Sequence, residues 1–406
     1  MGDIYENSHI TIAATASQDS SGGLFSADRA VVRCLLDKHP HLYVRKQPEY
    51  FPTRPYNTVP ISMPLLTRAW VYQERRLSHR TIHYGKHQVY WECQTDFASE
   101  DSREDKTWNK HATHPDTPDD LDWGDKCVDH KIDWQKTVTE YTMLRLTYES
   151  DRLLAIAAIV DRMLRLQRVD DVYIAGLWKN SILSDLPWVT TTNKPRPARM
   201  APSWSWASAQ SSAVSWASYE FTKEAKVVSL EYTIVGAANL GEVINASIIL
   251  MVPVLDLTGL VELDPAKIEG PGLRERFEDI SKSAPITARF RQNNLKVFST
   301  FFFPDYDLTT ANPPLKIGCT IKLLILRGPK GYIGGIVVQK TSKNPPEYKR
   351  IGFLNITPTA TKPEMLGKND EDLTRDYDSM EDYRKRRAEG RDSLILSLPM
   401  EEVKIV

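Results

Sequence analysis

The chain is poor in cysteine and carries almost no net charge. Its 406 residues include four cysteines, Cys34, Cys93, Cys127 and Cys319, which lie far apart in the sequence. Because no two of them form a CxxC pair, neither a zinc site nor a disulfide framework is indicated, and reduced thiols in a cytoplasmic or nuclear protein are expected. Lysine and arginine total 52 against 53 for aspartate and glutamate, so the general basic field of a nucleic-acid-binding protein is absent.

Long hydrophobic runs are also absent. The longest apolar stretches, such as residues 248–255, have the length of a strand, so no membrane span is expected. The first residues, MGDIYENSHITIAATA, do not place a basic start before an apolar core, and no secretion signal is expected. The signatures GxSxG, P-loop and HExxH do not occur, which removes the simplest sequence arguments for a hydrolase, a nucleotide-binding loop or a zinc protease.

The composition is that of a globular protein of two or three domains, with 41% hydrophobic and 26% charged residues. Residues 1–16 predict the end of a helix followed by a short buried strand containing Ile10 and Ile12. Residues 62–77 predict a helix, and 81–84 and 88–93 predict two short strands around Gly85. Residues 95–131 are polar throughout and predict a surface loop or linker.

The second half of the sequence changes character. Residues 132–200 predict a helical segment, in which the helical periodicity of residues 132–168 predicts a helix pair with Asp151 as the N-cap of its second member. From residue 201 to 406, segments at 226–235, 247–255, 320–326 and 332–339 are rich in Val, Ile, Leu and Tyr, which predicts a β-rich region. A charged insertion at about 361–392 predicts a solvated loop or short helix, with a segment that docks a partner as the alternative.

Several blocks resemble the fungal heterokaryon-incompatibility (HET) family, in the order usual for that family. The most specific is TRAWVYQERRLSHRTIHYGKHQVYWEC at residues 67–93; residues 1–25, APSWSWAS at 201–208 and YKRIGF at 348–353 resemble other blocks. The family's Ser-Tyr-x-Trp-Gly and Asp-Ala-x-Cys-Ile-Asn-Gln motifs do not occur, and Met1 aligns with an internal position of the family. The resemblance therefore implies that residues 1–94 are the C-terminal half of a HET domain.

The resemblance also implies a fold and a function. HET domains are thought to resemble the TIR fold, so the expected class is α+β or α/β: a partial TIR-like α/β module, a helical segment and a β-rich C-terminal region. The implied function is fungal non-self recognition and regulated cell death. The chain would act as a signalling or interaction module that binds protein partners, which include further copies of the chain. A HET-like protein recruited to another task, for example in a biosynthetic pathway, is an alternative.

Some TIR domains cleave NAD with a glutamate four residues after a tryptophan, and Trp70 and Glu74 have that spacing. On a helix, Leu66, Trp70 and Glu74 would share one face, where desolvation would raise the pKa of the carboxyl. The alternative function is thus an NAD glycohydrolase with Glu74 and Trp70 as catalytic residues and NAD as substrate, without a bound cofactor or metal.

Arg68, Gln73 and Arg75 are the candidate binding residues beside that pair. The competing interpretation is that Glu74, which is close to three arginines in sequence, is an ion-pair or capping residue.

Three further features allow a functional and a structural interpretation. His79, His83 and His87 are four residues apart, but the expected strand–turn–strand breaks the helical spacing that a shared metal ion needs. Cys93 lies next to Glu92 and across the hairpin from His83 or His87, yet a buried structural thiol is the simpler interpretation. Trp204 and Trp206 alternate in an extended segment, and core packing is favoured over stacking on a nucleotide.

Overall fold

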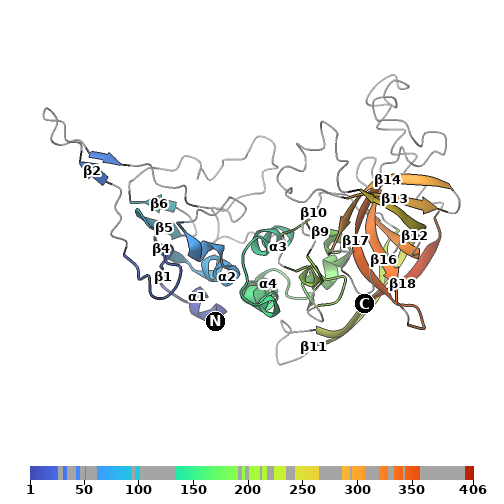
Figure 1. Ribbon diagram of the computed structural model, residues 1–406. Coiled ribbons are helices and arrows are strands. Elements are labelled where there is room, and N and C mark those ends of the chain that lie inside the picture. Colours follow the sequence, from blue (N-terminus) through green and yellow to red (C-terminus); the bar gives the residue numbers. More distant parts are fainter. Residues whose placement is uncertain are drawn as a thin grey trace, which may run out of the picture. The chain divides into compact units, whose positions relative to one another are not determined.

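The computed structural model divides the chain into two compact units, residues 1–169 and 170–406 (Figure 1). The boundary falls inside the segment 132–200 that is expected to be helical. Placement is described for residues 1–25, 31–33, 43–45, 51, 62–93, 97–100, 134–190, 194–196, 201–210, 213–216, 224–234, 243–264, 286–292, 295–306, 320–327, 333–341, 343–356 and 398–406. The charged insertion at 361–392 and most of the polar segment 95–131 lie outside these ranges.

A four-stranded sheet forms the centre of the first unit, in the order β1 (Thr11–Ala13), β4 (Arg80–Tyr84), β5 (Val89–Cys93) and β6 (Phe97–Ser99). Strands β1 and β4 are parallel, and the other pairs are antiparallel. The predicted hairpin around Gly85 is confirmed, because the Gly85 N–H donates to the Gln88 carbonyl at 3.0 Å. Strand β6 lies within the first residues of the expected loop. A separate two-stranded sheet joins β2 (Val31–Arg33) and β3 (Tyr43–Arg45).

The helices of the first unit differ from the sequence prediction in where they begin. They are α1 (Gly2–Glu6), η1 (Pro64–Thr67), α2 (Ala69–Leu77), α3 (Trp134–Thr142), η3 (Glu149–Asp151), η4 (Leu154–Ile156) and α4 (Ala157–Leu166). The helix expected at 62–77 is interrupted at Arg68, which is extended with φ −89° and ψ 131°. The prediction of Asp151 as an N-cap is wrong, since α4 begins only at Ala157 after a further 3₁₀ turn.

Helix α1 packs closely on α4, while the strand that follows it is more exposed than expected. A Cβ at Gly2 would lie 2.5 Å from the Cβ of Ala158, so the close approach of the two helices requires a glycine. The helix and the strand predicted in residues 1–16 both form. The expectation that this strand is buried is wrong for Ile12, which is 57% exposed.

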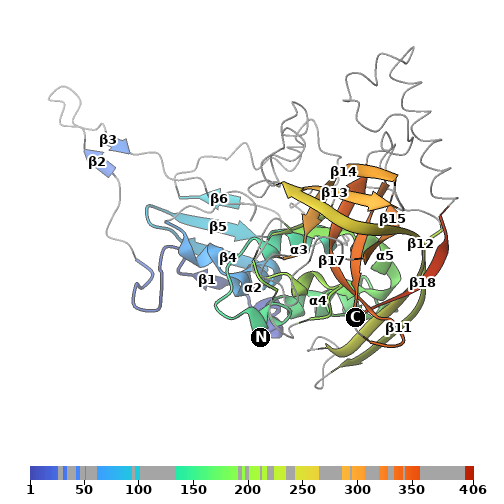
Figure 2. The same cartoon turned by 45° about the vertical axis from the view of Figure 1, so that its right-hand side comes forward.

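The second unit is built around an eight-stranded sheet that closes on itself. Its strands are β11 (Lys226–Ile234), β12 (Val243–Asp264), β13 (Ile286–Gln292), β14 (Leu295–Pro304), β15 (Thr320–Arg327), β16 (Ile333–Lys340), β17 (Tyr348–Ile356) and β18 (Met400–Ile405). The order β12-β13-β14-β17-β16-β15 returns to β12 through the β12–β15 pairing, and β11 and β18 flank β12 (Figure 2). The strands predicted at 226–235, 247–255, 320–326 and 332–339 are confirmed.

Short helices and strands, several of which contain tryptophan, precede this sheet in the sequence. The elements are β7 (Tyr173–Ile174), β8 (Leu177–Trp178), η5 (Lys179–Ser181), α5 (Ile182–Asp185), β9 (Trp188–Thr190), η6 (Trp206–Ser208) and β10 (Val214–Trp216). Trp204 and Trp206 are fully buried, which confirms core packing. Their expected alternation is wrong, because Ser205 is buried too and caps the 3₁₀ turn that starts at Trp206.

The expected combination of helices and sheets is present, so the fold is of the α+β kind. Among the described residues, no helix is both long enough and apolar enough to cross a membrane.

Candidate functional site

Helix α2 carries the residues predicted to form the site, but not as one continuous stripe. Leu66 belongs to the 3₁₀ turn η1, and the extended Arg68 separates that turn from α2. The predicted face of Leu66, Trp70 and Glu74 is therefore interrupted before it reaches Trp70. The buried residues of α2 are Ala69, Val71, Tyr72, Gln73 and Leu77, whereas Trp70 and Glu74 are half-buried.

Trp70 and Glu74 each bond to a different neighbouring element. The indole N–H of Trp70 donates to the Asp151 carboxylate in η3 at 3.1 Å. The Glu74 carboxylate accepts a hydrogen bond from the Tyr5 hydroxyl of α1. Burial, together with the charge and the hydrogen bond of Glu74, raises the pKa of Tyr5 to about 12. Both side chains thus connect α2 to other parts of the unit, and the partner given for Glu74 is a phenol rather than one of the nearby arginines.

Replacing Tyr5 by phenylalanine should cost about 1 kcal/mol of unfolding free energy at pH 7, because the bond to Glu74 is lost. A raised pKa means that the folded protein keeps the phenol proton after the unfolded chain, with a pKa of about 10, has released it. The stability due to this bond is therefore present below pH 10 and is lost as the pH rises towards 12. Urea titrations at pH 7 and pH 11 should show a smaller difference between wild type and Tyr5→Phe at pH 11; an equal difference would contradict the bond.

The three candidate binding residues are not brought together. Gln73 is 3% exposed, and its side-chain oxygen accepts from the backbone N–H of Ala158 at 3.2 Å, one of the first-turn donors of α4 that have no partner inside the helix. Arg68 is exposed, and a backbone bridge joins it to Arg145. Arg75 points to the sheet. A shared ligand contact by these three side chains is therefore not supported by their geometry.

Arg75 ends a buried chain of polar side chains, which we call the His83 cluster: Thr15, His83, Glu92 and Arg75. The Arg75 Nε donates to Glu92 Oε2 at 2.7 Å, and His83 Nε2 lies 3.1 Å from the same oxygen. On the other side of the ring, His83 Nδ1 lies 3.0 Å from the Thr15 hydroxyl. The cluster joins α2, the two central strands and the segment after β1.

The strand register explains why these polar groups meet. Thr81 and His83 of β4 are opposite Glu92 and Tyr90 of β5, and all four side chains are buried on the same face. The Phe51 ring packs edge-on to the imidazole, with centroids 4.9 Å apart, and below the Arg75 guanidinium at 5.2 Å. Sequence reasoning named Arg75 as a binding residue and His83 as one of three evenly spaced histidines, and it named Glu92 only as a neighbour of Cys93. The alternation of Thr81 with His83 and of Tyr90 with Glu92 is the signal that could have revealed the cluster.

Cys93 takes a different position from the one a cysteine nucleophile would need. It is opposite Arg80 at the end of the hairpin and is half-buried. Because successive side chains of a strand point to opposite faces, Cys93 and the adjacent Glu92 lie on different faces of the sheet. His83 lies on the Glu92 face and bonds to that carboxylate, so the thiol is not beside the imidazole.

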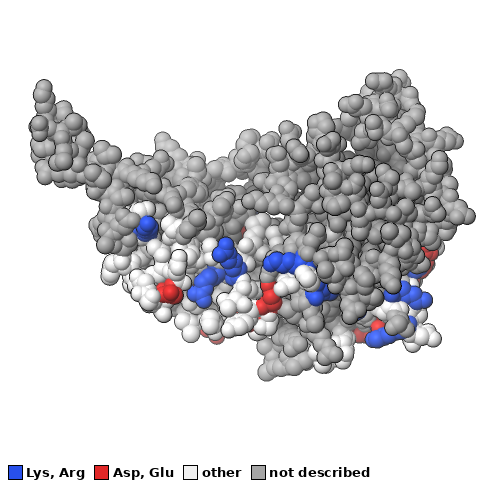
Figure 3. Space-filling view, in the orientation of Figure 1, with Lys and Arg blue, Asp and Glu red and all other residues white. Residues whose placement is uncertain are grey.

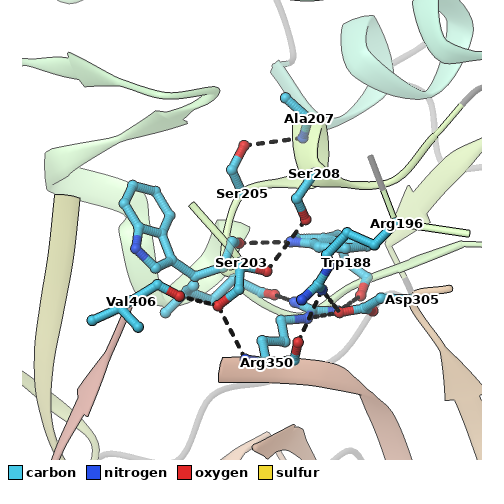
Figure 4. A network of polar contacts seen from close by, with 11 residues as sticks. Trp188, Arg196, Ser203, Ser205, Ala207, Ser208, Asp305, Arg350 and Val406 are labelled. Carbon is cyan, nitrogen blue, oxygen red and sulfur yellow. Dashed lines mark hydrogen bonds and ion pairs between the residues drawn. The ribbon is translucent and has the colours of Figure 1, made fainter. Parts of the chain in front are cut away.

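The second unit holds a larger polar network around Arg350 of β17 (Figure 4). The guanidinium forms a bidentate pair with Asp305, with Nε–Oδ2 at 2.9 Å and Nη2–Oδ1 at 3.0 Å, and both side chains are fully buried. The remaining donors of the guanidinium reach the backbone oxygens of Leu186 and Trp188, and the cation lies 3.6 Å from the centroid of the Trp188 ring. Burial raises the pKa of the Asp305 carboxyl, while the charges of Arg350 and Arg196 lower it.

The same network holds the tryptophan segment in place. The Ser203 hydroxyl accepts from the backbone N–H of Arg350 at 3.1 Å and donates to the backbone oxygen of Val406. The indole N–H of Trp188 donates to the Trp204 oxygen at 2.9 Å. Segments that resemble family blocks at 201–208 and 348–353 are thus packed on each other. Their role is structural, since Arg350 is enclosed by protein groups.

On the face shown in Figure 3, the basic and acidic side chains of the described residues form small separate groups. Three ion pairs among the described residues, Glu6–Arg165, Asp161–Arg165 and Lys343–Glu347, have N–O distances of 2.7, 3.0 and 2.8 Å.

Comparison with known proteins gives one family. The model of the family described as heterokaryon incompatibility protein (HET) matches residues 1–74. Neither a curated protein nor a solved structure matches the chain. The matched segment contains α1, β1, η1 and α2 as far as Glu74, and so includes Trp70, Gln73, Glu74 and the Tyr5 partner of Glu74. Residues 1–74 of this chain are therefore similar to the HET family.

Proposed function

We propose that this protein acts in fungal non-self recognition and regulated cell death as a cytoplasmic signalling or interaction module, through protein partners that include other copies of the chain. The HET match over residues 1–74 supports this function at the level of the family. A TIR-like arrangement of the first unit is part of the same proposal. The hydrogen bonds and the ion pair made by the predicted site residues also support a module without catalytic function.

Four of the five predicted site residues contribute to the internal structure of the first unit. Trp70 donates to Asp151, Gln73 accepts from Ala158, and Glu74 accepts from Tyr5. Arg75 is paired with Glu92. A glycohydrolase needs its carboxylate to face the scissile bond of the substrate, whereas Glu74 faces a phenol of its own fold. Helix α2 is thus best explained as the element that holds the module together.

Inducible expression in a filamentous fungus, together with purified protein, tests the proposal. Wild-type protein should arrest growth, and Glu74→Gln, which keeps a hydrogen-bond acceptor for Tyr5, should arrest growth to within about twofold of wild type. Purified wild type should leave NAD intact over hours, as measured by chromatography of the nucleotide. Glu100→Gln, at an exposed position of the same unit, is the matched control.

Two outcomes would count against the proposal. Loss of growth arrest in Glu74→Gln but not in Glu100→Gln, together with NAD cleavage by wild type alone, would establish the glycohydrolase instead. Absence of growth arrest with wild type, when immunoblots show the protein to be abundant, would contradict a role in cell death and favour a HET-like protein with another task.

A further inference from the structure

Two arginines, Arg68 and Arg145, lie side by side on the surface of the first unit. Arg145 belongs to the segment between α3 and η3. Its backbone N–H donates to the Thr67 carbonyl at 2.7 Å, and its carbonyl accepts from the Ala69 N–H at 2.9 Å. These two hydrogen bonds flank Arg68 and form a parallel bridge between the two arginines. Bridged residues lie roughly 4.8 Å apart and direct their side chains to the same face, so the two guanidiniums start from one patch of surface.

Both arginines are exposed, and neither guanidinium has an ion-pair or hydrogen-bond partner in the part of the chain that the structure describes. The carboxylates of the turn η3 have other partners. Glu149 pairs with Arg152 at 3.6 Å, and Asp151 accepts from the Trp70 indole. The two positive charges of the Arg68–Arg145 pair can therefore bind an anion that comes from another molecule.

This arrangement differs from that of other arginines in the same unit, which pair with glutamates: Arg75, Arg162 and Arg165. Two like charges on one backbone bridge lower the stability of a fold, because they repel each other. Proteins keep such locally unfavourable arrangements mainly where they serve a function. Arg68 is also the one predicted site residue whose side chain makes no bond within the described part of the unit.

The residues beside the Arg68–Arg145 pair are of the kinds found in protein interfaces. Met143 and Arg145, on either side of the half-buried Leu144, are both exposed. Tyr148, in the same segment, is 67% exposed. Because arginine, tyrosine and methionine are enriched in protein–protein interfaces, these surroundings favour a polypeptide ligand over a free ion or a nucleic acid.

We infer that the Arg68–Arg145 pair is a docking site for an acidic or phosphorylated segment of a protein partner, with both guanidiniums bound to one carboxylate or phosphoryl group. Guanidinium groups form paired, charge-assisted hydrogen bonds with both kinds of oxyanion, and arginine clusters recognise acidic and phosphorylated motifs in proteins. The inference rests on the proposed interaction function, because a protein carries the anion.

Fluorescence anisotropy with three labelled nine-residue peptides tests the site. The peptides share one uncharged sequence of Gly, Ser and Leu and carry Glu, phosphoserine or Gln at the same two positions. At low salt, wild type should bind the Glu or the phosphoserine peptide at least about tenfold more tightly than the Gln peptide, and added salt should reduce the difference. The tighter of the two anionic peptides identifies the group as a carboxylate or a phosphoryl group.

Three variants assign the binding to the two arginines. Arg68→Gln and Arg145→Gln should each weaken binding of the preferred peptide at least about fivefold. Arg165→Gln removes the same charge at an arginine that is already paired with Glu6, and its affinity should stay within about twofold of wild type. Equal affinity of wild type for all three peptides, or an equal loss in all three variants, would overturn the inference. An RNA 12-mer that bound the two arginines more tightly than either peptide would also overturn it.

Unfolding measurements without a ligand provide a second test. At low salt, Arg68→Gln and Arg145→Gln should each lower the unfolding equilibrium constant of the first unit by about twofold, because the repulsion is removed. The double variant should be no more stable than either single variant, since one substitution already removes the interaction. Separate losses of stability in the two single variants would mean that each guanidinium is bonded within the protein, which would overturn the inference.

Peptide binding and growth arrest distinguish failure of this inference from failure of the proposed function. Growth arrest by a wild type that does not prefer the anionic peptides would overturn the docking site and leave the proposed function in place. Peptide binding that depends on Arg68 and Arg145, in a protein that does not arrest growth, would support the docking site and contradict the role in cell death.

Discussion

Replacing Arg350 by methionine should lower the unfolding free energy of the second unit by about 3–5 kcal/mol, the range seen when one partner of a buried ion pair is removed. The variant leaves the Asp305 carboxylate buried without its bidentate partner, and it leaves the Leu186 and Trp188 carbonyls without their donor. Urea unfolding followed by tryptophan fluorescence measures the loss directly, because Trp188 packs against the guanidinium.

The pH dependence of Arg350→Met provides a second check. Burial raises the pKa of Asp305, and the positive charge of Arg350 lowers it. Removal of Arg350 should therefore raise this pKa further. A carboxyl whose folded pKa is raised stabilises the fold below its unfolded pKa of about 3.9, and that stability is lost as the pH rises. The difference from wild type should therefore be larger at pH 7 than at pH 4.

Matched variants separate the charge from the packing of Arg350. Lys349→Met changes an exposed residue of the same strand and should cost less than about 0.5 kcal/mol. Asp305→Asn combined with Arg350→Met removes both charges and should be more stable than Arg350→Met alone. If the single and double variants were equally unstable, the buried charge would not be the cause.

Replacing Glu92 by glutamine should destabilise the first unit by about 3 kcal/mol, although the side chain keeps its size. The change removes the one carboxylate that receives both Arg75 and His83, and loss of one partner from a buried pair is costly even when the shape is kept. Glu100→Gln, at an exposed position just after β6, keeps an acceptor for the Val89 N–H and should change the stability by less than about 0.5 kcal/mol.

Guanidinium titrations with two probes can assign the loss to the correct unit. The transition reported by hydrogen exchange in β4 and β5 should shift, whereas protection of the strands β16 and β17 should not. A loss of less than 1 kcal/mol would mean that the His83 cluster is not a major support of the first unit.

Local patterns were sufficient to predict several elements. The hairpin at β4 and β5 was predictable because two runs with strand propensity flank Gly85, and the strands β11, β12, β15 and β16 follow from their Val, Ile and Leu content. The packing of Trp204 and Trp206 in the core was predictable from the absence of basic residues around them.

Other features depend on contacts between distant residues. No local pattern distinguishes Arg68 as extended, yet its conformation separates Leu66 from the face of Trp70 and Glu74. A periodic apolar pattern also runs through the 3₁₀ turn η4 into α4, which is why the start of α4 was placed too early. Trp70 donates a hydrogen bond to Asp151, the residue that the sequence predicted as the N-cap of α4.

The candidate site was predictable only in part, for the same reason. The resemblance indicated helix α2, and the structure places its polar residues against Tyr5, Glu92, Asp151 and Ala158. Arg350 and Asp305 are 45 residues apart, so nothing in the sequence around either one signals a buried pair.

The length of β12 also bears on how the protein is made in the cell. This strand pairs with β11, β13, β15 and β18, and its partner furthest along the chain is Ile405, opposite Ile248. The ribosome therefore synthesises β12 long before residues 400–405. The edge of β12 that pairs with β18 lacks this partner strand while the residues between the two strands are synthesised. We expect the nascent second unit to need chaperone protection during that interval.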